Sequence, residues 1–156
     1  MNSASEELGA EEWIDRNPEK FRDAKPLYAH TRGNDKRGQF DKIYQTSDGR
    51  IIIIEAKGGN GTLTGRKIGG ENVQQGHPDY RKDVIKNYSK QFERAKKDPN
   101  VSPEDYAKMQ ETNEALQATL DPKNGDSPKF VVEYYVVRQT IDKNGNPGRI
   151  TVHQFN

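Results

Sequence analysis

The feature that most constrains the fold is a run of four isoleucines, Ile51 to Ile54. The turn sequence 47–49 (Ser-Asp-Gly) precedes the run and two glycines, residues 58 and 59, follow it, so the apolar segment has the length of a strand. Successive side chains of a strand point to opposite faces, and four apolar ones in a row require cover on both. Residues 50–57 are therefore predicted to form a central strand, buried on both faces.

The flanking segments predict the rest of the sheet. Residues 40–45 alternate as a strand that includes Asp41, and the turn at 47–49 should pair them with the isoleucine strand. The glycine-dense stretch 58–77 is too broken for a helix and has room for a short strand near 62–68. Residues 130–138 and 149–155 are predicted as closing strands joined by a turn at Asn144-Gly145.

Three helices are predicted around this sheet. The first runs from about Ser5 to Ile14 and ends before Pro18. The second runs from Pro78 to about residue 97, with buried side chains at four-residue steps. The third begins at the capping sequence Ser102-Pro103-Glu104-Asp105 and reaches about residue 119, with few apolar positions. The order of elements indicates an α/β protein with a mixed β-sheet flanked by helices.

The length and composition indicate a single domain. With 156 residues, of which 30% are hydrophobic and 31% charged, the chain can bury one core of moderate size. We expect that core from about residues 33–97 and 129–156, with residues 102–120 as a helical insertion. There is no cysteine, so a metal would need oxygen or imidazole ligands.

Neither a secretion signal nor a membrane span is recognisable in the sequence. The net charge of +1 alone does not indicate a polyanionic partner. The charges are nevertheless unevenly placed: residues 1–30 lean acidic, whereas the stretch after the isoleucine strand is basic. Its basic side chains are Arg66, Lys67, Arg81, Lys82, Lys86, Lys90, Arg94, Lys96 and Lys97. They could follow a phosphate backbone, but a charge run taken alone favours the solvated face of a helix.

Asp41, Glu55 and Lys57 form the candidate site. Glu55 and Lys57 are two positions apart and point to the same face of their strand, while Asp41 lies on the strand expected beside it. Two carboxylates at neighbouring strand ends can hold Mg²⁺ or a similar cation. Such an ion can bind a phosphodiester and activate water, and a lysine can stabilise the charge that develops on phosphorus. This arrangement favours metal-assisted phosphodiester hydrolysis.

The same residues resemble the PD-(D/E)xK restriction-endonuclease-like nucleases, and among them the nuclease toxin domains of bacterial polymorphic toxins. The resemblance lies in residues 38–44, 53–59 and 74–80, with Phe40 at the position of the proline in the family name. It implies a restriction-endonuclease-like core, with Asp41 and Glu55 as metal ligands and Lys57 assisting the attacking water. The implied metal is Mg²⁺, with Mn²⁺ or Zn²⁺ as alternatives.

The resemblance also implies further residues and partners. Gln75 becomes an accessory active-site residue, although it could instead pair with the glycine-rich loop, and Glu12 of the first helix completes the metal shell. Phosphate contacts are expected from Arg66, Lys67, Arg81 and Lys82, and His77 beside Gln75 could also reach a phosphate. The implied protein is a DNase toxin with little sequence preference and a cognate immunity protein. It would be delivered into a target cell as part of a larger toxin and act in its cytoplasm.

Three alternatives remain open from the sequence. The same metal site can cut RNA, and no residue separates the two substrates. A catalytically silent nucleic-acid-binding or interaction module could keep the fold, although intact Asp41, Glu55 and Lys57 speak against it. A housekeeping or phage repair nuclease would share the chemistry and lack a neighbouring inhibitor. The starting Met1 without a leader suggests a domain expressed apart from a larger carrier, with a free-standing protein as the alternative.

Overall fold

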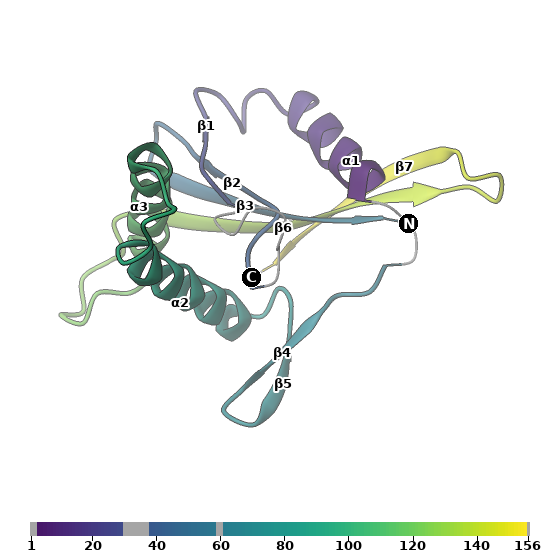
Figure 1. Ribbon diagram of the computed structural model, residues 1–156. Helices are drawn as coiled ribbons and strands as arrows, with labels where there is room; N and C mark the ends of the chain where they lie inside the picture. The colour runs from purple at the N-terminus through teal and green to yellow at the C-terminus, as the bar shows by residue number, and fades with distance from the viewer. Residues whose placement is uncertain (1–2, 30–37, 59–60, 156) are drawn as a thin grey trace.

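The computed structural model describes residues 3–29, 38–58 and 61–155. In these residues, the main elements are a five-stranded mixed sheet and three helices (Figure 1). The strand order is β1-β2-β3-β6-β7. The bounds are β1 Lys25–Pro26, β2 Lys42–Gln45, β3 Arg50–Gly58, β6 Val131–Ile141 and β7 Pro147–Phe155. The prediction of a mixed α/β fold is confirmed. Residues 33–37, 59–60 and 156 of the expected core lie outside the described residues.

The isoleucine strand β3 lies at the centre of the sheet, as predicted. It pairs antiparallel with β2 and parallel with β6, so both of its edges are hydrogen-bonded. Ile51 to Ile54 have no exposed surface. The run of isoleucines is therefore explained by cover on both faces of a central strand.

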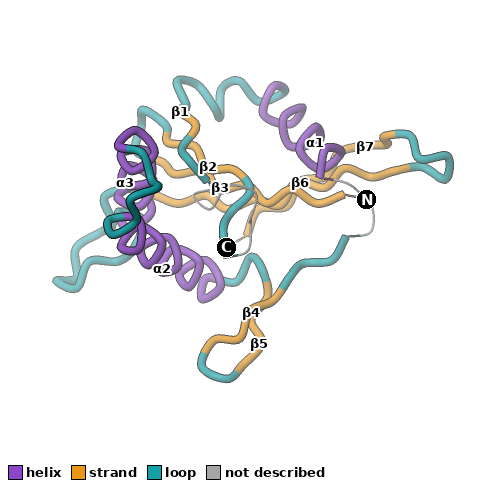
Figure 2. Tube along the Cα trace, in the orientation of Figure 1, coloured by secondary structure: helices purple, strands orange, loops and turns teal. Residues whose placement is uncertain are grey.

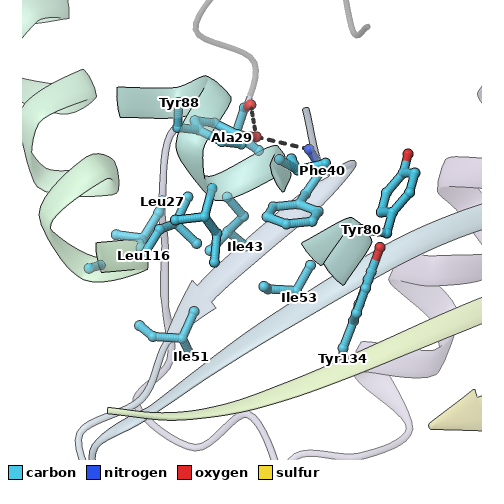
Figure 3. Packing of buried hydrophobic residues seen from close by; sticks show 13 residues of the cluster. Leu27, Ala29, Phe40, Ile43, Ile51, Ile53, Tyr80, Tyr88, Leu116 and Tyr134 are labelled. Atoms are coloured by element: carbon cyan, nitrogen blue, oxygen red, sulfur yellow. Dashed lines mark hydrogen bonds between the residues drawn. The ribbon is translucent and has the colours of Figure 1, made fainter. Parts of the chain in front are cut away.

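The two faces of β3 pack against different helices. Ile52, Ile54 and Ala56 lie in a cluster with Ala10 of α1 (Ser3–Asp15). On the other face, Ile51 and Ile53 join a larger cluster with side chains of α2 (Pro78–Ala95) and α3 (Pro103–Gln117), part of which Figure 3 shows. Alternation along one strand thus divides the core into an α1 side and an α2 side.

The two later helices follow their sequence signals. The predicted stripe of α2, which is Tyr80, Val84, Tyr88 and Phe92, is buried. At the start of α3 the Ser102 hydroxyl accepts a hydrogen bond from the Asp105 backbone N–H at 3.1 Å, which confirms the capping prediction. Leu116 of α3 is fully buried in the main cluster, so this helix contributes to the core even though few of its residues are apolar.

Three features differ from the predicted elements. The strand expected near residues 62–68 is β4 (Gly65–Ile68), which pairs with an unpredicted strand, β5 (Glu71–Gln74), in a hairpin separate from the main sheet. This hairpin projects away from the sheet in Figure 2. The two-residue strand β1 was not predicted. Asp41 lies just before β2 instead of inside it, and its side-chain carboxylate accepts the backbone N–H of Ala56 on β3.

Candidate active site

Glu55 is the centre of the site. It lies on the α2 side of β3, two residues beyond Ile53, and only 2% of its surface is exposed. The Gln75 side-chain nitrogen donates a hydrogen bond to Glu55 Oε2 at 2.5 Å, and the Tyr134 hydroxyl donates to Glu55 Oε1 at 3.4 Å. The carboxylate is thus held at both oxygens by side chains from distant parts of the chain.

Gln75 reaches Glu55 because the β4–β5 hairpin closes just before it. The Gln75 backbone N–H donates to the Thr64 carbonyl at 2.8 Å, and the Thr64 N–H donates to Gln75 Oε1 at 3.0 Å. The next residue, Gly76, has φ +95, which an L side chain rarely adopts, and the Phe155 ring occupies the space where a Cβ would be. Gln75 thus pairs with the glycine-rich loop and also contacts Glu55, while its role as an active-site residue stays a prediction.

Tyr134 is a site residue that the sequence did not reveal. It lies on β6, where Tyr134 faces the same side as Glu55 and packs its ring 4.9 Å from the Phe155 ring. Burial, followed by the nearby Glu55 charge, raises the pKa of the Tyr134 hydroxyl, which therefore stays protonated and able to donate. The only sequence signal was a tyrosine in an apolar strand, which is more often a packing residue.

Asp41 lies beside Glu55, just before β2 begins. Its Oδ2 accepts the backbone N–H of Ala56 at 2.8 Å, next to Glu55 in the chain. Lys57, half-buried, lies two residues further along β3 on the same face as Glu55. The structure therefore brings Asp41, Glu55, Lys57 and Gln75 together, as the sequence predicted.

The electrostatics of the site follow from this crowding. Burial raises the pKa of the Glu55 carboxyl well above its ordinary value, and the Asp41 charge raises it further. The Lys57 charge and the hydrogen bonds from Tyr134 and Gln75 act in the opposite direction but do not outweigh burial. A carboxylate in this position gains strongly from a nearby positive charge.

Glu12 is not brought to this cluster. It belongs to α1, which packs on the opposite face of the sheet, and its carboxylate pairs with Arg16 one turn later. Glu12 also lines a hollow of about 400 Å³ with Leu8, Gln139 and Pro147. Its assignment as a metal ligand therefore finds no support in the geometry, because the alternation of β3 places Glu55 on the α2 side.

Comparisons with known proteins do not assign this chain to a family. No protein-family model, curated protein or solved structure matches the chain. Within residues 3–29, 38–58 and 61–155, no helix is long and apolar enough to cross a membrane. What the site can do must therefore follow from its chemistry.

The predicted phosphate-binding residues are placed in different ways. Lys67 on β4 and Lys82 on α2 are exposed. Arg66 is engaged with Asp83 of α2, at 2.8 Å from Nε to Oδ2. His77 is exposed, but its Nδ1 accepts the Asp79 N–H at 3.0 Å and caps α2, which leaves its other ring nitrogen for a ligand.

Arg81 is the member of the predicted phosphate-binding set that points inward. Its Nη1 atom is buried and has no hydrogen-bond partner among the residues that the structure describes. Burial lowers the pKa of the guanidinium, and the nearby Tyr134 and Asp121 only partly offset this effect. The helical spacing of the basic residues could not show which of them turns toward the core.

The donor set fits a hard divalent cation in part. In the described part of the chain, no three Asp, Glu or His side chains lie close enough together to hold a metal. Asp41 and Glu55 offer two carboxylates, and Mg²⁺ commonly binds through one or two carboxylates with the remaining positions taken by water and substrate oxygens. A cation there would also offset the burial and the mutual repulsion that raise the Glu55 pKa.

Proposed function

We propose that the protein is a metal-dependent nuclease that hydrolyses phosphodiesters at the site formed by Asp41, Glu55, Lys57 and Gln75. The observation that carries this proposal is the Glu55 carboxylate, 2% exposed, beside a second carboxylate at the end of the central strand. An isoleucine there would fill the core at lower cost, because burying an ionisable group next to a like charge opposes folding. A group maintained at such cost suggests function.

Each residue of the candidate site has a definite task in this proposal. Asp41 and Glu55 hold the cation, which would lower the pKa of its bound water and neutralise charge on the phosphate. Gln75 and Tyr134 fix the two oxygens of Glu55, so that its carboxylate does not rotate. Lys57 places its ammonium on the same face, where it can orient the attacking water or stabilise the charge on phosphorus. The restriction-endonuclease-like core belongs to this proposal, on the resemblance of the motifs.

DNA is the favoured substrate and RNA the second candidate, because the same chemistry serves both. The proposal extends to a toxin domain that is delivered into a target cell as part of a larger protein, acts in the cytoplasm and is neutralised by a cognate immunity protein. Support for this extension comes only from the motif resemblance. Coexpression with the product of the neighbouring reading frame tests it: a cognate inhibitor should restore growth to cells that express the wild-type chain.

The direct test of the activity is cleavage of plasmid DNA and of total RNA in parallel, with EDTA, Mg²⁺, Mn²⁺ or Zn²⁺. We expect cleavage that requires a divalent ion. Glu55→Gln, Asp41→Asn and Lys57→Ala should each reduce it by about a hundredfold or more, because they remove groups that act on the transition state. Glu71→Gln is the matched control, since Glu71 is exposed on the hairpin.

The outcomes separate the candidates. Loss of plasmid cleavage in all three site variants, with Glu71→Gln fully active, supports the nuclease. Cleavage of RNA alone would transfer the proposal to an RNase. If wild type and Glu55→Gln leave both nucleic acids equally intact in every metal while still binding them, the catalytically silent module is correct.

A further inference from the structure

Where the core under α2 ends, one face of β6 and β7 carries a group of basic side chains. Along β6, Tyr134 faces Glu55, so Val136 and Arg138 share that face by alternation. The antiparallel register sets Arg138 opposite Thr151 and Val136 opposite His153, and Arg149 follows on the same side because Ile150 packs in the α1 cluster. We call Arg138, Arg149, Thr151 and His153 the basic sheet face.

The core under α2 does not extend to these residues. The cluster on that side reaches Tyr134 on β6 and Phe155 on β7 and stops there. Arg149, Thr151 and His153 are exposed and Arg138 is half-buried. No acidic residue occupies this face of either strand within β6 and β7, since the one glutamate of these strands, Glu133, faces the other side with Tyr135. Within β6 and β7, this face therefore carries basic side chains and no carboxylate.

The basic sheet face continues directly from the candidate site. Lys57 pairs with Arg138 in the parallel register of β3 and β6, and Arg138 pairs with Thr151. Lys57, Arg138 and Thr151 thus form one row across three neighbouring strands, about 5 Å apart from strand to strand. A phosphate bound at Glu55 and Lys57 would have its neighbours in the same strand close to this row.

We propose that the nucleic-acid strand that enters the candidate site continues over the basic sheet face, with Arg138 and Arg149 contacting its phosphates and the Thr151 hydroxyl available as a donor. This inference rests on the proposed nuclease function and adds the path of the substrate on β6 and β7. Contacts of this kind position the strand and read no sequence. The path lies outside the α2 and hairpin residues that the sequence indicated for phosphate binding.

A nucleic acid suits this face better than an acidic protein because the row leads into the site where a phosphodiester would bind. The Arg138 guanidinium also donates to the Gly61 carbonyl, which holds it over the sheet next to the residues that follow β3. Arg149 makes no ion pair with any carboxylate in the described part of the chain, and the Thr140 hydroxyl donates to its backbone carbonyl rather than contacting its guanidinium. Arg149 is accordingly the cleanest residue for a test.

The test measures binding of a short fluorescently labelled DNA duplex, and of its single strand, as a function of salt. All variants carry Glu55→Gln so that the probe is not cut. Arg149→Gln should weaken binding roughly three- to tenfold near 0.1 M salt and lower the slope of log K against log salt by about 0.9 for the duplex. Arg138→Gln should act in the same direction. The matched control is Arg22→Gln, an exposed arginine in the connection between α1 and β1.

Binding and salt slope unchanged in Arg149→Gln, as in Arg22→Gln, would overturn the inference and leave an acidic protein as the occupant of this face. A loss confined to Arg149→Gln and Arg138→Gln supports it. Plasmid cleavage by the chain with an intact Glu55 is measured separately. If the plasmid is cut but Arg149→Gln does not change DNA binding, the proposed substrate path alone is wrong. If Arg149→Gln weakens DNA binding but the plasmid is not cut, the proposed nuclease activity alone is wrong. Thermal unfolding verifies that each variant is folded.

Discussion

The side-chain amide of Gln75 joins the hairpin base to the buried carboxylate of Glu55: its nitrogen donates to Glu55 Oε2 and its oxygen accepts from the Thr64 N–H. Both partners lose their hydrogen bond in Gln75→Leu, which keeps a similar volume. We expect the free energy of unfolding to fall by about 1–3 kcal/mol, because Oε2 of the buried Glu55 carboxylate and the Thr64 backbone N–H are left without these partners. Urea denaturation near neutral pH measures it.

The control for that change is Gln74→Leu, because Gln74 is the exposed neighbour at the end of β5. It should alter the unfolding free energy by no more than about 0.5 kcal/mol. Equal effects of the two substitutions would show that the Gln75 hydrogen bonds contribute nothing to the folded state.

The raised pKa of Glu55 predicts a pH dependence of stability. Folded Glu55 holds its proton at a higher pH than unfolded Glu55, whose ordinary pKa is 4.5, so its contribution is fully present below that value and is lost as pH rises through the folded pKa. In metal-free buffer, Glu55→Gln should therefore become more stable than wild type as pH rises above about 4.5. Urea denaturation across pH, with and without Mg²⁺, measures the difference, which a bound cation should reduce.

Glu133 provides the opposite sign as a control. Burial opposes its ionisation, but hydrogen bonds from Tyr135, Arg50 and Lys20 outweigh burial and lower its pKa. Its contribution is present above the ordinary pKa and is lost as pH falls through the folded pKa, so Glu133→Gln should be less stable than wild type at neutral pH and approach it in acid. If both glutamine variants show the same pH trend, the Glu55 assignment is wrong.

Gly76 should tolerate alanine poorly for two separable reasons. Its φ is +95, and a Cβ would lie 2.2 Å from Cε1 of Phe155. Gly70 shares a positive φ of +84 but has nothing within 4 Å of its Cβ position. Gly70→Ala should cost about 1 kcal/mol from backbone strain alone, and Gly76→Ala about 1–3 kcal/mol more from overpacking. The measurement is the free energy of unfolding of both variants.

A double-mutant cycle separates the clash from the strain. In a Phe155→Ala background the extra cost of Gly76→Ala should vanish, leaving a penalty equal to that of Gly70→Ala. A cost that persists without the Phe155 ring would mean that the close contact does not determine the need for glycine at this position.

Arg81 should be replaceable without loss of stability. Its buried Nη1 lacks a hydrogen-bond partner in the described residues, so Arg81→Met removes an uncompensated polar atom while keeping most of the packing. We expect an unfolding free energy equal to or above that of wild type. Arg94→Met, at an exposed position of α2, is the control and should have little effect. A loss of more than about 1 kcal/mol in Arg81→Met alone would show that the guanidinium is satisfied in solution.

The sequence predicted the elements whose signals are local. Four successive isoleucines indicated a strand covered on both faces, and the Ser102 cap indicated where α3 begins; both are confirmed. The convergence of Asp41 with Glu55 also follows from local information, because one tight turn fixes the pairing of their strands. The mixed α/β fold class and the convergence of Asp41 with Glu55 were thus accessible without coordinates.

The remainder depends on long-range pairing. Tyr134 meets Glu55 across 79 positions of sequence, and no local pattern sets the register of the parallel strands β3 and β6. Glu12 was assigned to the site from resemblance alone, since nothing in a helix sequence states which face of a sheet the helix will cover. The strand near residues 62–68 was predicted without its partner because β5 is short and polar.

The parallel pairing of β3 and β6 has a kinetic consequence. Strands in this arrangement cannot be joined by a tight turn, so they can align only after the long connection between them, which contains α2 and α3, is available and its loop has closed. The hydrogen bond from the Tyr134 hydroxyl to Glu55 can form only once the two strands are aligned. We therefore expect a chain that is still being synthesised, or threaded unfolded through a pore, to be inert, and to gain its chemistry only once β6 has paired with β3.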